Sequence, residues 1–374
     1  MKKSVMIAAA CAAIISCAPK TEITLFPESD FEAVVDGKNV SIYTLNAGDL
    51  TMQVTNFGGR VVSLWVPDKD GEYEDVVLGR NTIDKYVNYD GERFLGAVVG
   101  PYANRIAGGT YTIGEETYNF PQNNNGQTLH GGLKGLDMIP WDVDSVTENQ
   151  IVLSVICPDG HDGMPGNRKI VMTYTLTPDN EFKVDYVAET DKATHMNISH
   201  HSFFNLKGEG NGTINDHVLC INASNTTPVD EVLIPTGEIA DVTGTPFDFR
   251  TAKPIGQDVD AENEQLKNGS GYDHNWVLDR KTADELEFAA SVWEPASGRY
   301  MEVWTDQPAI QFYGGNFFDG KREGKYGKTL NYRESIALET QKYPDTPHHS
   351  HFPSTLLNPG ETYTHVCVYR FSVK

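Results

Sequence analysis

The chain has 374 residues, with 52 acidic and 30 basic side chains and a net charge of −22. A chain of this length can bury a large hydrophobic core. The strong negative charge argues against nucleic acid or an anionic membrane surface as a binding partner. Its 34 glycines and 19 prolines mark many turns, which favours short strands over long helices.

The first residues have the composition of an export signal. Two lysines precede an apolar segment over residues 5–15, which is too short to span a bilayer as a helix. This segment ends in Ile14-Ile15-Ser16-Cys17, which resembles a bacterial lipobox. We therefore predict a lipoprotein signal peptide over residues 1–16, lipidation of Cys17 after cleavage, and a flexible tether over residues 17–30.

Lipidation of Cys17 would place the protein in the cell envelope of a bacterium, facing the periplasm or the cell surface. The lipid would then be its only contact with a membrane. An ordinary signal peptide followed by an incidental cysteine is the alternative.

Short strand-like segments separated by turn residues follow the tether. They cover residues 50–56, 151–157, 169–176, 182–189, 218–221, 300–305 and 363–373. A helical period is visible only near residues 261–267. This pattern predicts an all-β fold, a large antiparallel β-sandwich. No linker or repeat divides the chain, so we expect a single domain over residues 31–374.

Three cysteines remain after the export segment, namely Cys157, Cys220 and Cys367. An exported protein can form disulfides, but an odd number of cysteines leaves at least one thiol free. All three lie in apolar, alternating segments, so we expect them to be buried thiols in the core.

Two titratable residues stand in apolar strand-like segments. Alternation along a strand places Glu339 on one face with Ala337 and Gln341. A carboxylate on a buried face is costly unless it is paired or functional, and desolvation raises its pKa toward a value that suits a general base. His201 lies in the second such segment, Asn197 to Leu206. The two residues are candidates for moving protons on a neutral substrate. A core histidine and a structural ion-paired glutamate are the alternative.

Further motifs occur in a fixed order around these two residues. They are Gly100-Pro101-Tyr102-Ala103-Asn104-Arg105-Ile106, Thr128-Leu129-His130-Gly131-Gly132, Gly271-Tyr272-Asp273-His274-Asn275 and Glu339-Thr340-Gln341-Lys342-Tyr343-Pro344-Asp345. Together with the segment around His201, their order and spacing closely resembles the aldose 1-epimerases, also called galactose mutarotases. The resemblance runs from about residue 35 to the C-terminus. Each motif alone is weak, but the ordered set is specific.

The resemblance implies a galactose mutarotase-like supersandwich with its site in a cleft on one sheet. It also implies an isomerase that interconverts the α and β anomers of free aldohexoses such as glucose and galactose. Opening the sugar ring needs a base at the C1 hydroxyl, which matches Glu339, and an acid at the ring oxygen, which matches His201. This chemistry requires no metal and no organic cofactor. A monosaccharide is the expected partner, and the sequence leaves the oligomeric state open.

The resemblance also assigns the residues that bind the substrate. Asn104 and Arg105 would form hydrogen bonds with sugar hydroxyls, and Arg105 cannot itself act as an acid. His130 would lie near the ring oxygen or a neighbouring hydroxyl. Asp273 would accept hydrogen bonds from hydroxyls, and Gln311 would contact the C1 side of the sugar.

Three positions depart from the commonest pattern of this family. His200 stands where an asparagine usually precedes the catalytic histidine, Pro101 stands where many members carry arginine, and Phe203 replaces a tyrosine. None of these changes removes a proton-transfer group, so they affect preference among sugars rather than the chemistry. Phe203 shares a strand face with His201, where it would either line the sugar or pack in the core.

Two other functional classes remain open. A non-catalytic sugar-binding lipoprotein would keep Arg105 and Asp273 but would not need Glu339 or His201. A hexose-6-phosphate epimerase, or another carbohydrate-active enzyme on a related sandwich, would need clustered basic side chains to hold a phosphate. The motifs contain only Arg105 as an obvious candidate for that role.

A histidine-rich tract follows the Glu339 motif. His348, His349 and His351 lie close to Asp345 in the sequence, and such tracts can bind zinc. A polar loop is the other interpretation of this segment, and we assign no metal site from the sequence.

Overall fold

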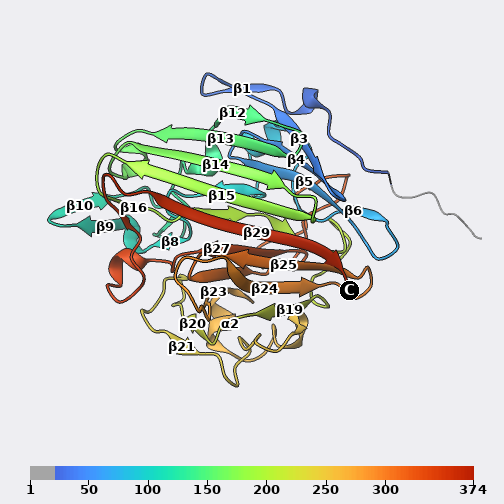
Figure 1. The fold of residues 1–374 in the computed structure, drawn as a ribbon. Helices are drawn as coiled ribbons and strands as arrows, with labels where there is room; N and C mark the ends of the chain where they lie inside the picture. The colour runs from blue at the N-terminus through green and yellow to red at the C-terminus, as the bar shows by residue number, and fades with distance from the viewer. Residues whose placement is uncertain (1–21) are drawn as a thin grey trace, which may run out of the picture.

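The computed structural model describes residues 22–374, so the predicted signal peptide, Cys17 and the first part of the tether lie outside the described residues. Strands dominate the fold and pack in layers (Figure 1). The two α-helices of the described part are α1 (Asp84–Val87) and α2 (Glu264–Asn268). Neither has the length and apolar composition that a membrane span requires.

The largest sheet has nine antiparallel strands. In spatial order they are β12 (Asp142–Val146), β13 (Gln150–Cys157), β14 (Arg168–Leu176), β15 (Glu181–Thr190), β29 (Tyr363–Val373), β25 (Arg299–Thr305), β24 (Glu287–Trp293), β19 (Val218–Ile221) and β22 (Lys253–Pro254). In β13, the buried residues Ile151, Leu153 and Val155 alternate with more exposed ones, as a strand with one covered face requires. Every strand predicted from the sequence in this sheet is confirmed.

Two smaller antiparallel sheets complete the main layers. The six-stranded sheet has the order β18 (Phe203–Phe204), β27 (Ile336–Gln341), β26 (Ala309–Tyr313), β23 (Asp273–Val277), β20 (Asn225–Thr227) and β21 (Ala240–Asp241). The four-stranded sheet has the order β3 (Ile42–Ala47), β4 (Leu50–Thr55), β5 (Arg60–Pro67) and β6 (Tyr73–Asp75). Every residue of β26 and β27 is buried, so these two strands are covered on both faces.

Short two-stranded pairs connect the layers. They are β1 (Ala33–Val35) with β2 (Lys38–Val40), β7 (Ala97–Val99) with β17 (Ser199–His201), β8 (Arg105–Ile106) with β11 (Thr128–Leu129), β9 (Thr110–Ile113) with β10 (Glu116–Asn119), and β16 (Thr194–His195) with β28 (Leu356–Leu357). The 3-10 helices are η1 (Glu28–Asp30), η2 (Ala107–Gly109), η3 (Leu136–Met138), η4 (His161–Gly163), η5 (Ile255–Gln257) and η6 (Thr346–His348).

The helix predicted near residues 261–267 corresponds to α2. The Asn263 side chain caps it by accepting hydrogen bonds from the backbone N–H groups of Gln265 and Leu266, at 2.9 and 3.3 Å. Leu266 is buried and anchors this short helix to the core.

One hydrophobic core fills the space between the layers. It includes Met172 of β14 and Tyr369 of β29 from the nine-stranded sheet, and Leu338 of β27 from the six-stranded sheet. A hydrogen bond of 3.0 Å from the Tyr369 hydroxyl to the Leu338 carbonyl joins the two sheets. The predicted antiparallel β-sandwich is therefore confirmed.

The opposite face of β27 packs against a second hydrophobic cluster. Ala337 belongs to that cluster, with Phe203 and Tyr313, while Ile336 and Leu338 belong to the main core. The strand parity expected from the sequence is thus correct, and it places Glu339 on the Ala337 face.

The sequence predicted that the folded domain starts at residue 31. In the structure, the packed body already includes Phe26. The Phe26 N–H donates to Gln53 Oε1 at 2.8 Å, and the Phe26 ring stacks on Tyr326 with centroids 5.5 Å apart. The last part of the predicted tether is therefore docked on the sandwich. An apolar side chain and a paired backbone hold it there.

The three cysteines of the described part are free thiols. Cys157 and Cys367 are buried, as the sequence predicted, and burial raises the pKa of Cys157 to about 11. Cys220 is only half-buried, so the prediction of a core thiol is wrong at this position. Its strand, β19, lies next to the edge strand β22 of the nine-stranded sheet.

Candidate active site

The structure brings Glu339 and His201 together from two different strands. Glu339 lies in β27 and His201 ends β17, which pairs with β7. The distance from His201 Nε2 to Glu339 Oε1 is 3.3 Å. Glu339 is 2% exposed and His201 is 4% exposed. The sequence placed both side chains in buried strands, but only the fold puts them in contact.

Burial acts in opposite directions on the two pKa values. It raises the pKa of Glu339 well above the ordinary 4.5; Asp273 raises it further, and Arg105 lowers it in part. Burial lowers the pKa of His201 to about 3. Both effects favour the neutral side chain. The pair therefore holds one proton between its two members over a wide pH range, as an acid–base couple requires.

His130 is fixed in one tautomer by the backbone around it. The backbone N–H of Asn104 donates to the ring nitrogen Nδ1 of His130 at 3.1 Å. The backbone N–H of His130 in turn donates to the Asn104 carbonyl at 3.0 Å. Burial lowers the pKa of His130 well below 6.5, so the ring is neutral. Since Nδ1 accepts a hydrogen bond, the ring proton lies on Nε2. His130 therefore offers an N–H donor to a ligand.

A buried ion pair that the sequence did not predict holds the loop after His130. Arg93 donates to both oxygens of Asp137, at 2.6 and 2.7 Å, and to the Gly132 carbonyl at 2.9 Å. A Cβ atom on Gly131 would collide with the Gly100 carbonyl oxygen, so this position requires glycine. The sequence showed the two glycines, but nothing in it linked them to an arginine far from their motif.

Asp273 begins β23 and is held from two sides. Gln311 Nε2 donates to Asp273 Oδ1 at 2.7 Å, and Arg105 lies 3.8 Å from Asp273 Oδ2. Arg105 Nε also donates to Asn124 Oδ1 at 3.2 Å. The carboxylate is thereby oriented before any ligand arrives.

These side chains surround a cavity of about 420 Å³. Six of the seven predicted site residues line it, namely Asn104, Arg105, His130, His201, Asp273 and Glu339. Gln311 does not line it and instead supports Asp273 from behind. The wall also contains residues that no motif indicated, among them Tyr89, Glu92, Phe94, Leu133, Tyr313 and Phe317.

The structure decides the role of Phe203 and places His200. Phe203 is fully buried against Tyr313 and Phe318, and its ring centroid is 4.6 Å from that of His201. It packs in the core and supports the histidine, so it does not line this cavity. His200 faces the main core, where its Nδ1 lies 2.9 Å from the Tyr174 hydroxyl.

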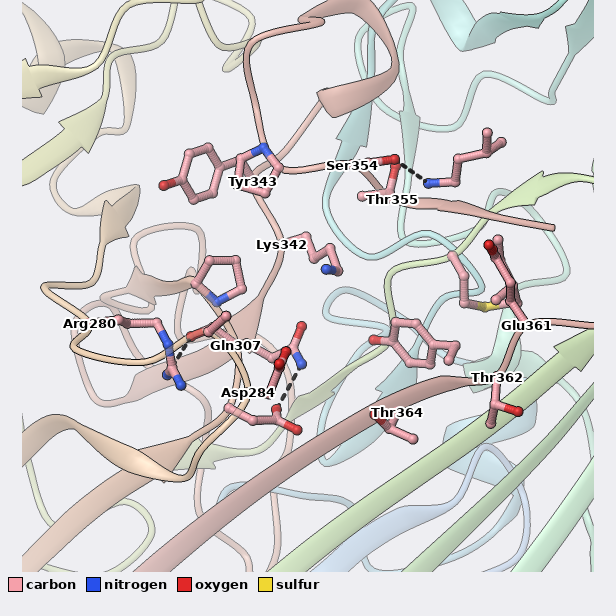
Figure 2. Close-up of a pocket in the computed structure, with 18 of the residues that line it drawn as sticks. Arg280, Asp284, Gln307, Lys342, Tyr343, Ser354, Thr355, Glu361, Thr362 and Thr364 are labelled. Carbon is pink, nitrogen blue, oxygen red and sulfur yellow. Dashed lines mark hydrogen bonds between the residues drawn. The ribbon is translucent and has the colours of Figure 1, made fainter.

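A larger cavity, of about 820 Å³, lies beyond the end of β27 (Figure 2). Lys342, Gln307 and Asp284 reach into it, but Glu339 and His201 do not line it. The Arg280 guanidinium beside it donates to the carbonyls of Thr305 and Gln307 and is not free for a substrate. The smaller cavity holds the acid–base pair, and we therefore take it as the active site.

The donor atoms of the site do not favour a metal ion. Among residues 22–374, His130, His201 and Glu339 form the one group with ligand atoms within 4.8 Å of each other. Metal binding through His130 Nε2 would move its proton to Nδ1, which would then face the Asn104 N–H instead of accepting from it. This site fits a hydrogen-bonded substrate better than a metal.

The histidine-rich tract does not form a three-ligand set. His348 and His349 face the two oxygens of Asp345, at 2.7 and 3.5 Å. His351 donates instead to the Gly237 carbonyl at 2.8 Å. Asp345 also accepts from the Ala107 N–H at 2.8 Å, so the tract connects the loop after β27 to the start of η2, which directly follows the strand of Arg105.

The fold and the site define an acid–base enzyme built on a β-sandwich, with its reacting pair in a polar cavity. The family model for aldose 1-epimerase matches residues 41–370. The galactose mutarotase of Bos taurus is 41% identical over 334 residues, which cover 89% of this chain and 94% of that protein. The aldose 1-epimerase of Escherichia coli K12 is 36% identical over 340 residues, covering 90% and 96%.

Solved structures agree with this comparison. A GalM/aldose epimerase homologue from C. elegans superimposes with a TM-score of 0.82 at 31% identity, over 89% of this chain and 99% of that chain. A galactose 1-epimerase from Lactobacillus acidophilus gives a TM-score of 0.78 at 28% identity, over 92% and 97%. The chain belongs to the aldose 1-epimerase family, and it is an isomerase of the mutarotase type.

Proposed function

We propose that the protein interconverts the α and β anomers of free aldohexoses such as glucose and galactose, with Glu339 as base and His201 as acid. The observation that carries this assignment is the 3.3 Å contact between the two buried side chains in the wall of the cavity. The names of the relatives point to galactose and to aldoses as the substrate class.

The reaction can be written with the proton of the pair. Proton transfer across the 3.3 Å contact gives the Glu339 carboxylate and the His201 imidazolium. The carboxylate takes the proton of the C1 hydroxyl, the bond from C1 to the ring oxygen breaks, and His201 protonates that oxygen. The open-chain aldehyde rotates about its C1–C2 bond. The reverse transfers close the ring on the other face and restore the pair.

The surrounding groups would hold the sugar by hydrogen bonds. Asp273 and Arg105 are oriented to accept from and donate to hydroxyls, and Asn104 lies next to them at the cavity wall. The Nε2–H group of neutral His130 would donate to the ring oxygen or a neighbouring hydroxyl. Such fixed donors lower the cost of reorganisation as charge develops during ring opening.

Charge favours a free sugar over a sugar phosphate. The carboxyl groups of Glu92, Asp273 and Glu339 line the cavity. Of the two arginines there, Arg93 is paired with Asp137. A phosphate ester would need unpaired cations that this cavity lacks among its described lining residues. This supports anomer conversion of neutral sugars over a hexose-6-phosphate epimerase.

Polarimetry on freshly dissolved α-glucose and α-galactose tests the proposal. The purified protein should accelerate the approach to the equilibrium rotation in proportion to its concentration. Unaccelerated mutarotation of both sugars by a folded protein would leave the non-catalytic sugar-binding alternative.

We also propose that the mature protein is lipid-anchored through Cys17 in a bacterial cell envelope. The support is the lipobox-like sequence Ile14-Ile15-Ser16-Cys17, which lies outside the described residues. An enzyme placed there would act on free sugars released outside the cytoplasm. It would equilibrate their anomers before an anomer-selective transporter or enzyme uses them.

A further inference from the structure

A glutamate that no motif indicated lies in the wall of the catalytic cavity. Glu92 lines the cavity next to Arg93 and Phe94, and its Oε1 accepts a hydrogen bond from the Phe94 N–H at 2.9 Å. Within the described part of the chain, no side chain donates a hydrogen bond to Glu92 and no cation forms an ion pair with it. Its other oxygen, Oε2, thus has no side-chain partner among these residues.

The other carboxylates of the cavity are already engaged. Glu339 faces His201 at 3.3 Å, and Asp273 accepts from Gln311 at 2.7 Å. Glu92 therefore adds a third carboxylate acceptor to the cavity wall, and this one faces no side-chain partner within residues 22–374.

The charges around Glu92 do not neutralise it. Arg93 directs its guanidinium to Asp137 and the Gly132 carbonyl. Desolvation raises the pKa of Glu92, while the backbone N–H groups of Phe94 and Arg93 and the charges of Arg80 and Arg60 oppose this rise. Arg80 itself donates to the backbone carbonyls of Glu323 and Asp90 rather than to Glu92.

We propose that Glu92 is a specificity-determining residue. Its Oε2 atom accepts a hydrogen bond from a group of the substrate that contacts neither Glu339 nor His201. The site then favours sugars with a donor at that position, a hydroxyl or an ammonium group, and rejects sugars with an anionic group there. This inference rests on the proposed function, because it assumes that the cavity binds an aldose.

The physical reason is the cost of covering the half-buried carboxylate of Glu92 without giving it a donor. A bound sugar excludes water from the cavity wall, so the free oxygen of Glu92 must find a donor on the ligand or lose its hydration. A hydroxyl or an ammonium group restores the bond. A carboxylate or phosphate at the same position adds like-charge repulsion to the lost hydration.

The test compares Glu92→Ala and Glu92→Gln with the wild type, and uses Glu148→Gln as a matched control. Glu148 is exposed in the turn between β12 and β13, outside the cavity. Polarimetry gives kcat and KM for α-glucose and for 2-, 3-, 4- and 6-deoxyglucose. Glucosamine and glucuronate are added as competing ligands, and thermal unfolding checks the fold of each variant.

We expect Glu92→Ala to raise KM for glucose by about 10–100-fold, the range for a lost hydrogen bond to a charged group, with kcat changed less. One deoxyglucose should be a poor substrate for the wild type and should lose nothing further in the variant, because it already lacks the donor. Glu92→Gln keeps an acceptor oxygen, so it should retain most of its affinity for glucose. It should bind glucuronate about 10-fold more tightly and glucosamine more weakly than the wild type.

The outcomes separate this inference from the function on which it rests. A wild type without mutarotase activity overturns the proposed function. An active wild type, with folded Glu92 variants whose KM is unchanged for every sugar, overturns the role of Glu92 alone. Equal losses on all the sugars, including every deoxyglucose, would show that Glu92 only supports the fold and would also overturn the inference.

Discussion

At the scale of single residues, the active site depends on burying two ionisable groups next to each other. Burial raises the pKa of Glu339 and lowers that of His201, so each group is most stable when neutral. Moving the proton from Glu339 to His201 creates two buried charges, and their attraction across the 3.3 Å contact offsets part of that cost. Asp273 differs, because Gln311 and Arg105 hold it for binding.

Glu339→Gln and His201→Asn should each lower kcat by at least ~100-fold, the usual scale for a general acid or base. Gln keeps the shape of the glutamate side chain and Asn keeps a polar amide in place of the imidazole, and each substitution removes the group that transfers a proton. Polarimetric kinetics measure the loss, and circular dichroism checks the fold. Glu148→Gln is the control for the loss of a glutamate charge. Near-normal turnover in either folded variant would contradict the assignment.

Glu339→Gln should also stabilise the protein at neutral pH. A carboxyl whose folded pKa is raised above 4.5 penalises the folded state as pH rises from 4.5 through the folded pKa. Glutamine has no charge to desolvate, so the variant avoids a penalty of about 1.4 kcal/mol for each unit by which the pKa is raised. Denaturant unfolding at pH 7 and pH 4 checks this. The gain should be present at pH 7 and small at pH 4; a loss of stability at pH 7 would contradict it.

The lowered pKa of His201 affects the stability of the folded state at acidic pH instead of neutral pH. Its folded value of about 3 lies below the ordinary 6.5, so the penalty on the folded state grows as pH falls from 6.5 towards 3. The comparison at pH 4 therefore has to include His201→Asn, which lacks this penalty. That variant should gain stability relative to the wild type at pH 4 and not at pH 7.

Arg105→Met and Asp273→Asn should raise KM, because each removes a charged hydrogen-bonding group worth roughly 1.5–3 kcal/mol. The expected increase is about 10–100-fold, with a smaller fall in kcat if the sugar is misaligned. Initial rates over a range of glucose and galactose concentrations measure it. Unchanged KM values for both variants on both sugars would show that these residues do not bind the substrate.

At the scale of elements, the site is assembled where short segments meet β27. β26 pairs with β27 so that Gln311 lies opposite Glu339, and β18 pairs with it so that Phe203 lies opposite Ala337. The loop around His130 approaches from another pair of strands, β8 and β11. The strand pairing of the backbone therefore places the side chains of the site, and this pairing tolerates little shift in register.

Arg93→Met tests how the His130 loop is held. Removing one partner of a buried ion pair leaves Asp137 with Arg60 alone, at 3.6 Å, and should cost about 3 kcal/mol. The freed loop should also weaken sugar binding. Urea unfolding and KM measure the two effects. Lys38→Met breaks an exposed ion pair with Asp142 and should cost less than about 1 kcal/mol. Equal costs for the two variants would contradict the structural role of Arg93.

At the scale of the whole molecule, a main core and a second hydrophobic cluster on either side of β27 support a catalytic domain that reaches back to Phe26. The segment before residue 22 leads to the predicted anchor, outside the described residues. The net charge of −22 does not favour binding to an anionic membrane through the protein's own side chains.

Mass spectrometry of the mature N-terminus tests the anchor. It should show a diacyl- or triacyl-modified Cys17, because the sequence before it resembles a lipobox. Cys17→Ala should release the protein into the soluble fraction or block processing. Cys157→Ala is the control for the loss of a thiol that lies in the folded body. An unmodified Cys17 on a soluble protein would overturn the anchored location and leave the enzyme assignment intact.

The sequence by itself predicted the fold class, the family and the positions of several long strands, and it singled out Glu339 and His201 as the candidate reacting residues. Periodicity and ordered motifs are local properties of the chain, and Glu339 and His201 stood out because a charge in an apolar strand is costly. Only the tertiary structure decided which groups touch. It fixed the His130 tautomer, placed Gln311 against Asp273, packed Phe203 in the core, and brought Glu92 and Arg93 to the site. These outcomes depend on contacts between segments far apart in sequence, and no local pattern encodes them.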